Sequence, residues 1–366
     1  MSVQNEIRKA YERHDKKEYE WYSLRPILGH ANWAIFYLLL GGREAGKSYS
    51  VTNFFVDQYV NKGIPFTWLR LTEAASRKLL QNNAEKLVDP DLRRKYNLDL
   101  ITSGNNVYQV TKRSAPDVNG KTKILEKKLM ARVYAISTFY NDKGSIFDKD
   151  FLNDPAMRYN IAIDEFQREK GEKNTFDIVY SLVNQLENLV RSTKDRTKIF
   201  FLGNTLEDSS DILCAFNFIP ETWGIYKLKK KRAVIHFIEP TEAYKKRRKG
   251  TIADILMPTA STFTNKIDTD STLITKKRLI KPSYVIKFTK DKNDWFCVWD
   301  SNIIRKYNNE RVDCRAMRPY LDEFYSVDLA KQIIELFDTR CFQFTNLITF
   351  KQFQKQIQLL KPRQGG

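Results

Sequence analysis

Short apolar segments alternate with longer, more polar stretches between residue 34 and about residue 240. The apolar segments are bounded by turn residues, as β-strands are, and residues 175–191 carry apolar side chains at helical spacing. Strands that alternate with helices are typical of an α/β domain with a mostly parallel sheet. The predicted strands are residues 35–40, 66–71, 132–136, 160–163, 198–202 and 233–238, and the predicted helices are residues 47–59, 72–85 and 175–191. Residues 105–128 are polar and turn-rich and predict an excursion such as a hairpin.

The pattern changes beyond residue 240. Residues 257–270 are rich in threonine and serine, as linkers are. Further on, residues 284–288 and 295–299 predict strands, and residues 327–337 predict a helix. The sequence therefore predicts three parts, namely a first domain at 1–240, a linker at 241–270 and a smaller α+β domain at 271–366.

The chain is strongly basic. Its 62 Lys and Arg residues outnumber 44 Asp and Glu residues, which gives a formal net charge of +18. Such a surplus suits a polyanionic partner, either nucleic acid or an anionic membrane, although a solvated basic surface is the simpler alternative. The longest apolar run, residues 34–40, is far shorter than the roughly 20 residues that a membrane-spanning helix needs. Nucleic acid is therefore the favoured partner, and no membrane is expected.

The cysteines and the N-terminal segment predict a reduced, cytosolic protein. The four cysteines are far apart and form no C-x-x-C pair, and three histidines leave few ligands for a zinc site. Residues 6–20 are mixed in charge and lack the features of a signal peptide.

The strongest motif follows the first predicted strand. It reads Gly41-Gly42-Arg43-Glu44-Ala45-Gly46-Lys47-Ser48 and matches the pattern G-x-x-x-x-G-K-[ST] in full. In such loops the backbone N–H groups cradle phosphate oxygens, the lysine reaches the β- and γ-phosphates, and the serine hydroxyl binds Mg²⁺. The loop also opens a predicted helix, whose N-terminus favours an anion. These features predict an ATP site and leave a chance glycine-rich turn as the weaker alternative.

A second motif lies at the end of the strand predicted at residues 160–163. Asp164 and Glu165 follow this strand directly. In an ATPase, Asp164 would hold Mg²⁺ and Glu165 would polarise the attacking water. Two carboxylates at a solvated strand end are common, but a catalytic role is favoured downstream of a phosphate loop. The pair also favours hydrolysis over nucleotide-kinase chemistry.

Two further positions are weaker candidates. Asn204 follows the strand predicted at 198–202 and is placed to contact the γ-phosphate or its water, although Gly-Asn alone is a turn dipeptide. Arg191 ends the helix predicted at 175–191. It either complements that helix's dipole or acts as an arginine finger in a neighbouring subunit's site.

Together these segments resemble the DNA packaging (encapsidation) ATPases of small picovirus-type tailed phages. The similarity covers most of residues 34–240, in the same order. The run Asp164-Glu165-Phe166-Gln167-Arg168-Glu169-Lys170 is distinctive of that family, whereas Arg43 in the phosphate loop, the helix end at 186–191 and Leu202-Gly203-Asn204 are ordinary for ring ATPases. The resemblance implies an additional-strand (ASCE, RecA-like) P-loop ATPase, with ATP and Mg²⁺ as its cofactors.

The family also implies an assembly and roles for further residues. It implies a homo-oligomeric ring of five subunits that threads double-stranded DNA into an empty capsid through the portal (connector), with a structural packaging RNA as a further partner. Such a motor works in the host cell cytoplasm, is transiently at the portal vertex and is absent from the mature virion. Arg191 matches the arginine finger, and Lys143 and Lys170 match basic residues that face the neighbouring site. Arg70 also matches a family arginine, but Thr72 and Glu73 stand where the family is basic.

Beyond residue 240 the resemblance is weak, and it implies a nuclease-like (RNase H-like) fold for the C-terminal domain. A two-metal nuclease needs several carboxylates that converge from strand centres. The strands predicted at 284–288 and 295–299 have no acid at their centres, and Asp291, Asp294 and Asp300 lie only at their ends. We therefore expect a vestigial domain that contacts DNA or capsid without cutting DNA.

Three alternatives to a packaging motor remain. A P-loop helicase or recombination ATPase would share the motifs of the first domain. A basic nucleic-acid-binding protein with a vestigial P-loop would explain the charge, but it leaves the intact Lys47, Ser48, Asp164 and Glu165 without a role. A nucleotide kinase is disfavoured, because a small-molecule enzyme has no use for a net charge of +18.

Overall fold

The computed structural model describes residues 21–117, 120–138, 158–166, 178–190, 196–204, 211–220, 222–256, 273–275, 277, 282–289, 291–300, 302–306 and 327–361. The chain forms two compact units. The first comprises Met1–Leu206 and Pro220–Ile267, and the second comprises Glu207–Ile219 and Asp268–Gly366.

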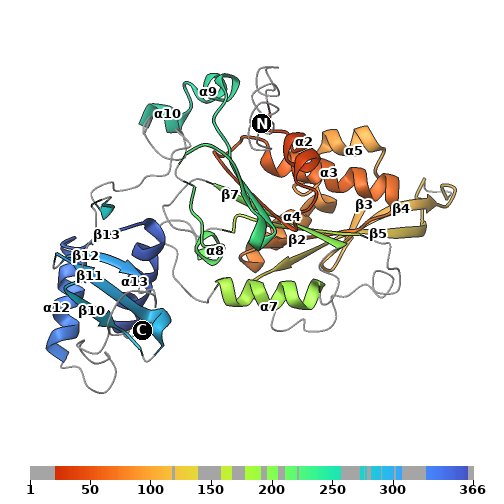
Figure 1. Ribbon diagram of the computed structural model, residues 1–366. Coiled ribbons are helices and arrows are strands. Elements are labelled where there is room, and N and C mark those ends of the chain that lie inside the picture. The colour runs from red at the N-terminus through yellow and green to blue at the C-terminus, as the bar shows by residue number, and fades with distance from the viewer. Residues whose placement is uncertain are drawn as a thin grey trace. The chain divides into compact units, whose positions relative to one another are not determined.

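A large sheet forms the centre of the first unit (Figure 1). Its order is β3-β4-β5-β2-β6-β7-β1-β9-β8. The neighbours from β5 to β9 pair in parallel, and the pairs at the two edges are antiparallel. The strands are β1 (Phe36–Gly41), β2 (Phe66–Arg70), β3 (Leu100–Ser103), β4 (Asn106–Arg113), β5 (Ile124–Ala135), β6 (Tyr159–Asp164), β7 (Thr197–Asn204), β8 (Gly224–Leu228) and β9 (Ala233–Phe237). The central strands are buried along almost their whole length, as parallel strands covered on both faces are.

Strand β7 lies between β1 and β6. It therefore separates the strand that leads into the phosphate loop from the strand that ends in the two carboxylates, as an additional strand does. Gly41 pairs with Asn204, and Asp164 pairs with Leu202, in register. Because these strands are parallel, their carboxyl ends meet at one edge of the sheet.

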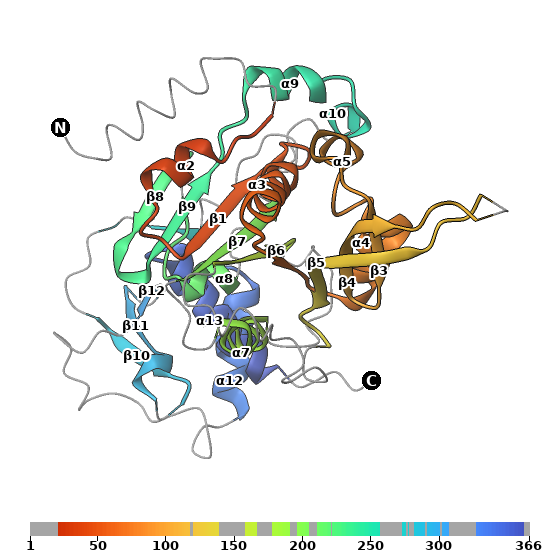
Figure 2. The same ribbon diagram turned by 90° about the vertical axis from the view of Figure 1, so that its right-hand side faces the viewer.

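Helices cover both faces of this sheet (Figures 1 and 2). On one face, apolar side chains of α2, α3, α4 and α5 join a core that includes Phe55, Trp68 and Phe200. On the opposite face lies α7, whose buried Gln185 donates to the carbonyl oxygens of Ala135 and Ile136. The helices of this unit are α2 (Arg25–His30), α3 (Lys47–Lys62), α4 (Glu73–Ala84), α5 (Pro90–Tyr96), α7 (Ile178–Val190), α9 (Glu242–Arg248) and α10 (Ile252–Leu256), with a 3₁₀ turn at Lys229–Lys231.

One predicted helix differs in detail, and the predicted excursion is confirmed. The helix predicted at 72–85 is interrupted, because Gln81, Asn82 and Asn83 have non-helical dihedral angles. Both asparagines are left-handed, a conformation that asparagine adopts more readily than most residues. The excursion predicted at 105–128 is a hairpin of β4 and β5, which reaches beyond the rest of the sheet (Figure 2).

The linker predicted at 241–270 is wrong for its first part. Residues 242–256 fold into α9 and α10 and belong to the first unit. The side chain of Thr241 accepts a hydrogen bond from the backbone N–H of Tyr244, and Glu242 lies in the first turn. This start signal stands directly before the basic cluster of residues 245–249.

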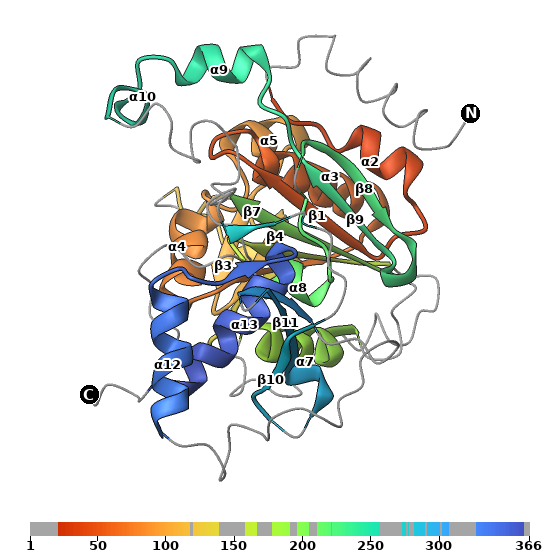
Figure 3. The same ribbon diagram turned by 60° about the vertical axis from the view of Figure 1, so that its left-hand side comes forward.

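The second unit has α+β architecture (Figure 3). Its described sheet has the order β10-β11-β12-β13, antiparallel except for the last pair. Phe288, Phe296 and Phe353 pack edge to face in its core. The elements are α8 (Asp211–Ala215), β10 (Tyr284–Lys287), a 3₁₀ turn (Lys292–Asp294), β11 (Trp295–Trp299), β12 (Ile303–Lys306), α12 (Val327–Asp338), β13 (Gln343–Phe344) and α13 (Leu347–Leu360). A nuclease-like origin of this unit stays a prediction.

Within the described ranges, no helix is both long enough and apolar enough to cross a membrane. Cys214, Cys297 and Cys341 are free thiols. Cys314 lies outside the described residues.

Candidate nucleotide-binding site

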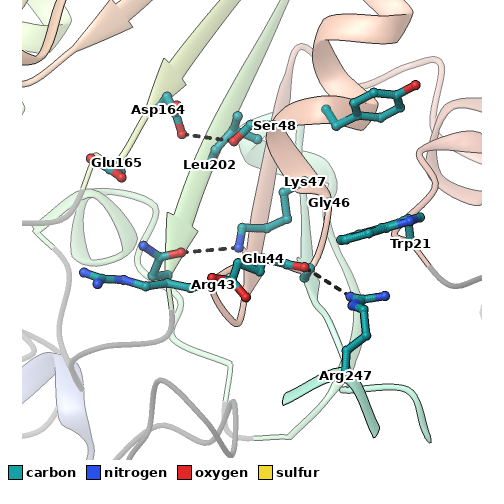
Figure 4. A pocket seen from close by; sticks show the side chains of 13 residues that line it. Trp21, Arg43, Glu44, Gly46, Lys47, Ser48, Asp164, Glu165, Leu202 and Arg247 are labelled. Atoms are coloured by element: carbon teal, nitrogen blue, oxygen red, sulfur yellow. Dashed lines mark hydrogen bonds between the residues drawn. The ribbon is translucent and has the colours of Figure 1, made fainter. Parts of the chain in front are cut away.

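A pocket of about 730 Å³ opens at the edge of the sheet where β1, β6 and β7 end (Figure 4). The phosphate loop (residues 41–48) forms its floor, and the carboxylates after β6 lie at one end of it. The residues that line it are Trp21, Arg43, Glu44, Ala45, Gly46, Lys47, Ser48, Tyr49, Asp164, Glu165, Leu202, Asn204 and Arg247.

The phosphate loop needs its glycines for two different reasons. Gly46 has a φ of 91° and begins α3 from a left-handed conformation, which glycine adopts without strain. At Gly42 the reason is space, because a Cβ there would lie 2.3 Å from the Oη of Tyr244. The 16-residue helix α3 then directs its positive N-terminal end at the loop.

Lys47 is buried although it is charged. Only 6% of it is exposed, and its Nζ donates to the carbonyl oxygens of Gly41 at 2.8 Å and Gly42 at 2.7 Å. The Oδ1 of Asn204 lies 3.4 Å from the same nitrogen. Burial lowers the pKa of Lys47 to about 8, against the opposing attraction of Asp164 and Glu165. The ammonium group is thus held over the loop and is weakly solvated, so a phosphate oxygen is a strong competitor for its N–H groups.

Asp164 connects the phosphate loop to a neighbouring strand. Its Oδ1 lies 3.5 Å from the Oγ of Ser48, and its Oδ2 accepts from Nη1 of Arg70 at 2.7 Å. Arg70 also donates through Nη2 to Oε2 of Glu165 at 2.5 Å. One guanidinium at the end of β2 therefore pairs with both carboxylates and fixes their orientation.

Glu165 is placed differently from Asp164. Its backbone has a φ of 53°, and its N–H donates to the carbonyl oxygen of Leu202 at 2.9 Å. Its side chain is 56% exposed, whereas that of Asp164 is 10% exposed. The left-handed turn directs the second carboxylate out of the sheet and towards the open pocket, and such strained conformations are frequent at functional sites.

The groups at this edge of the sheet are of the kinds that bind a magnesium–nucleotide complex. Lys47 and the loop N–H groups are anion ligands, and the Ser48 hydroxyl and the Asp164 carboxylate are hard oxygen ligands. Among the residues that the structure describes, no three His, Cys, Asp or Glu side chains gather into a metal cage. Mg²⁺ ordinarily needs none, because it binds one or two protein oxygens together with substrate phosphates.

Helix α9 packs on the phosphate loop, which the sequence did not predict. The Oη of Tyr244 donates to the carbonyl oxygen of Arg43, and Arg247 donates to that of Glu44. Arg248, which is almost fully buried, forms an ion pair with the Glu44 carboxylate at 2.8 Å. Part of the basic cluster at 245–249 thus binds the protein's own loop. The N-terminal signal of Thr241 and Glu242 is a sequence feature that indicates a helix there.

The structure brings most of the predicted site residues together. Residues 41–48, Asp164, Glu165 and Asn204 approach one another at the same edge of the sheet. Trp21 and Arg247, which the sequence did not single out, line the same pocket. The three candidates for action in a neighbouring site, Arg191, Lys143 and Lys170, lie outside the described residues.

Comparison with known proteins bears on the fold. No protein-family model and no curated protein matches the sequence. The structure resembles "The bacteriophage Phi-29 viral genome packaging motor assembly" with a TM-score of 0.61 and 17% identity, over 94% of this chain and 100% of that chain. It resembles "The Phi-28 gp11 DNA packaging Motor" with a TM-score of 0.58 and 16% identity, over 95% of this chain and 100% of that chain. This chain is therefore similar in fold to phage DNA packaging motors along nearly its whole length.

Proposed function

We propose that this protein is an ATPase that drives double-stranded DNA into an empty phage capsid. The observation that carries the proposal is the convergence of Lys47, Ser48, Asp164 and Glu165 on one pocket. A phosphate-binding lysine, a pair of Mg²⁺ ligands and a water-orienting carboxylate are the groups that nucleotide hydrolysis requires.

Each residue has a separate part in hydrolysis. Lys47 exchanges the carbonyl oxygens of Gly41 and Gly42 for phosphate oxygens and compensates their charge. Ser48 and Asp164 would hold Mg²⁺, which would supply charge neutralisation of the transferred phosphoryl group. Glu165 accepts a hydrogen bond from the attacking water and orients it, once its carboxylate separates from Arg70. Asn204, next to Lys47, contacts the γ-phosphate side of the site.

The proposal that DNA is the partner is supported by the charge of the chain and by its fold. The chain has a formal net charge of +18, and Lys229, Lys230 and Lys231 form an exposed turn between β8 and β9. Such a turn contacts phosphates without reading bases, as a motor that moves along any sequence requires. The solved structures of similar fold are packaging motors by their names.

The assembly part of the proposal follows the same resemblance. The protein would form a homo-oligomeric ring, with five subunits expected, at the portal of the procapsid in the host cytoplasm, and a packaging RNA is a further expected partner. In this ring Arg191 would reach the site of a neighbouring subunit, with Lys143 and Lys170 near the same interface. A ring places such a finger where it neutralises transition-state charge.

Two variants separate binding from hydrolysis. Lys47→Ala should lose ATP binding, because the loop then lacks its buried positive charge. Glu165→Gln should bind ATP and Mg²⁺ with near wild-type affinity but turn over about 10² to 10⁴ times more slowly, the range of a lost general base. Equilibrium binding of ATP and steady-state phosphate release measure both. Wild-type turnover in Glu165→Gln would remove Glu165 from the proposed role.

A P-loop helicase or recombination ATPase remains the alternative within the same chemistry. A bound DNA end and a requirement for the procapsid would separate a packaging motor from it. A DNA-binding protein with a vestigial P-loop would show no turnover in either variant or in the wild type.

A further inference from the structure

The pocket continues past the phosphate loop to an aromatic side chain that the hydrolytic chemistry does not use. Trp21 lines the pocket and is 50% exposed. The guanidinium of Arg247 lies 3.7 Å from the centroid of the Trp21 ring, so one face of the indole is already stacked. Figure 4 shows Trp21 beside Gly46, on the far side of the loop from Asp164 and Glu165.

The backbone that carries Trp21 is fixed to the site. The N–H of Tyr22 donates to the carbonyl oxygen of Ala45 at 2.9 Å, and the Oη of Tyr22 lies 3.0 Å from Nδ1 of the buried His236. Two residues on, the N–H of Leu24 donates to the Oγ of Ser50 in α3 at 3.1 Å. The segment is thus anchored to the phosphate loop, to β9 and to α3, while the indole itself stays open. An exposed aromatic ring on an anchored backbone is a preorganised binding surface.

Arg247 is anchored as well. Its Nη2 donates to the carbonyl oxygen of Glu44 at 3.2 Å, and its guanidinium also lies 5.9 Å from the centroid of the Tyr244 ring. The neighbouring Arg248 pairs with the Glu44 carboxylate. The helix α9 therefore presents Arg247 to the Trp21 ring at a defined place on the loop, and the contact gains from cation–π attraction.

The position of Trp21 and Arg247 agrees with the orientation in which a nucleoside triphosphate would lie in the pocket. Lys47 and Glu165 mark the γ-phosphate end of the pocket, because the lysine reaches the β- and γ-phosphates and the carboxylate orients the attacking water. The nucleoside is attached at the opposite end of the triphosphate. Trp21 lies at that opposite end of the pocket (Figure 4), and Tyr49 of the first turn of α3 is a further lining residue.

We propose that Trp21, with Arg247 stacked on one face, is the platform on which the nucleobase of the bound triphosphate stacks. The inference rests on the proposed nucleotide-binding function and names the part of the ligand that this end of the pocket holds. Arg247 is a positioning residue, which holds the indole in place from α9. The larger ring system of a purine gains more from such a surface than a pyrimidine does.

The test compares ATP with inorganic tripolyphosphate, which has the phosphates but no base. Titration calorimetry in Mg²⁺ on the full-length protein measures the affinity for each. Trp21→Ala should weaken ATP binding about tenfold or more, the range expected for one lost base–aromatic stack, and should leave tripolyphosphate binding within about twofold. Trp21→Phe should recover most of the ATP affinity, because it keeps an aromatic face.

Two substitutions elsewhere in the same unit serve as controls. Trp223→Ala removes an indole that does not line the pocket, and Lys246→Ala removes a positive charge from the same helix as Arg247. Neither should change the affinity for ATP, whereas Arg247→Ala should weaken ATP binding and not tripolyphosphate binding.

The outcomes separate this inference from the function on which it rests. Equal loss of ATP and tripolyphosphate affinity in Trp21→Ala would mean that Trp21 only supports the loop, and unchanged ATP affinity would mean that the base lies elsewhere. Either result overturns the platform while nucleotide binding stands. A wild-type protein that binds neither ligand would overturn both.

Discussion

Arg70 donates to Asp164 across 2.7 Å, and the two side chains are only 15% and 10% exposed. Removing one partner of such a pair leaves a charge with little solvent to stabilise it. We expect Arg70→Met to lower the free energy of unfolding by about 3 kcal/mol, and Arg70→Met with Asp164→Asn to cost much less than the two single changes added together. Urea denaturation of the wild type, the two single variants and the double variant measures the coupling energy between Arg70 and Asp164.

A second cycle on Arg113 and Asp99 provides the control. That pair has two hydrogen bonds, at 2.6 and 3.0 Å, but its side chains are 37% and 48% exposed. Its coupling should be much smaller than that of Arg70 and Asp164, because solvent screens the two charges. Coupling as small at Arg70 and Asp164 as at the control pair would mean that Arg70 does not hold the site together.

The substitution Gly42→Ala tests whether the packing of α9 on the phosphate loop matters for ATP binding. In Gly42→Ala the new Cβ would lie 2.3 Å from the Tyr244 Oη and 2.9 Å from its Cζ, so Tyr244 must move and α9 with it. We expect weaker ATP binding by about tenfold or more, and recovery of most of it when Tyr244→Ala is added, since the clash is then removed. Gly29→Ala is the matched control, because a Cβ at Gly29 meets nothing within 4 Å. Failure of Tyr244→Ala to restore binding would show that the loop itself needs glycine at residue 42.

The lowered pKa of Lys47 predicts how nucleotide affinity depends on pH. With a pKa of about 8, Lys47 is charged at pH 7 and neutral at pH 9 in the free protein. Binding of an anionic phosphate favours the charged form, so above pH 8 binding must take up a proton. ATP affinity should therefore be level below pH 7.5 and fall by up to about tenfold per pH unit above 8. Lys47→Arg should bind more weakly but show no such fall, because a guanidinium stays charged. A wild-type affinity that is constant from pH 7 to 9.5 would contradict the assignment.

The C-terminal unit should not cut DNA. Asp291 caps the 3₁₀ turn at Lys292–Asp294, Asp294 accepts from Thr289 and Gln356, and Asp300 pairs with Lys277. These acids are engaged in turns and surface pairs rather than converging on a metal site. Linear and circular duplexes incubated with the protein in Mg²⁺, and then in Mn²⁺, should stay intact on a gel. Cleavage that Asp291→Ala or Asp300→Ala abolishes would reverse this expectation.

The sequence predicted the site better than it predicted what surrounds the site. Residues 41–48, Asp164 and Asn204 were predictable, because strand ends in a parallel sheet meet at one edge and the motifs name the chemistry. Arg70 was found through family resemblance, but its bond to both carboxylates depends on β2 lying beside β6, which no local pattern encodes. The kink at Asn82 and Asn83 was missed for a related reason, since helical periodicity continues across both asparagines while the backbone leaves the helix.

The sequence did not predict that α9 packs on the phosphate loop, because its basic residues suggest a solvent-exposed segment. Lys245, Lys246, Arg247 and Arg248 look like a solvated or DNA-binding cluster in the sequence. In the structure two of them face inward to Glu44, and Tyr244 packs against Gly42. A helix of seven residues has little intrinsic stability, so its place depends on tertiary contacts that the sequence alone does not reveal.

The rate of ATP hydrolysis with and without linear duplex DNA tests the central claim most directly. Measured at saturating ATP and Mg²⁺ and moderate salt, the wild-type rate should rise severalfold with duplex DNA and less with single-stranded DNA of equal length, whereas Glu165→Gln should stay near background with both. A wild-type protein that hydrolyses ATP at the same rate whether or not duplex DNA is present would contradict a DNA-translocating motor.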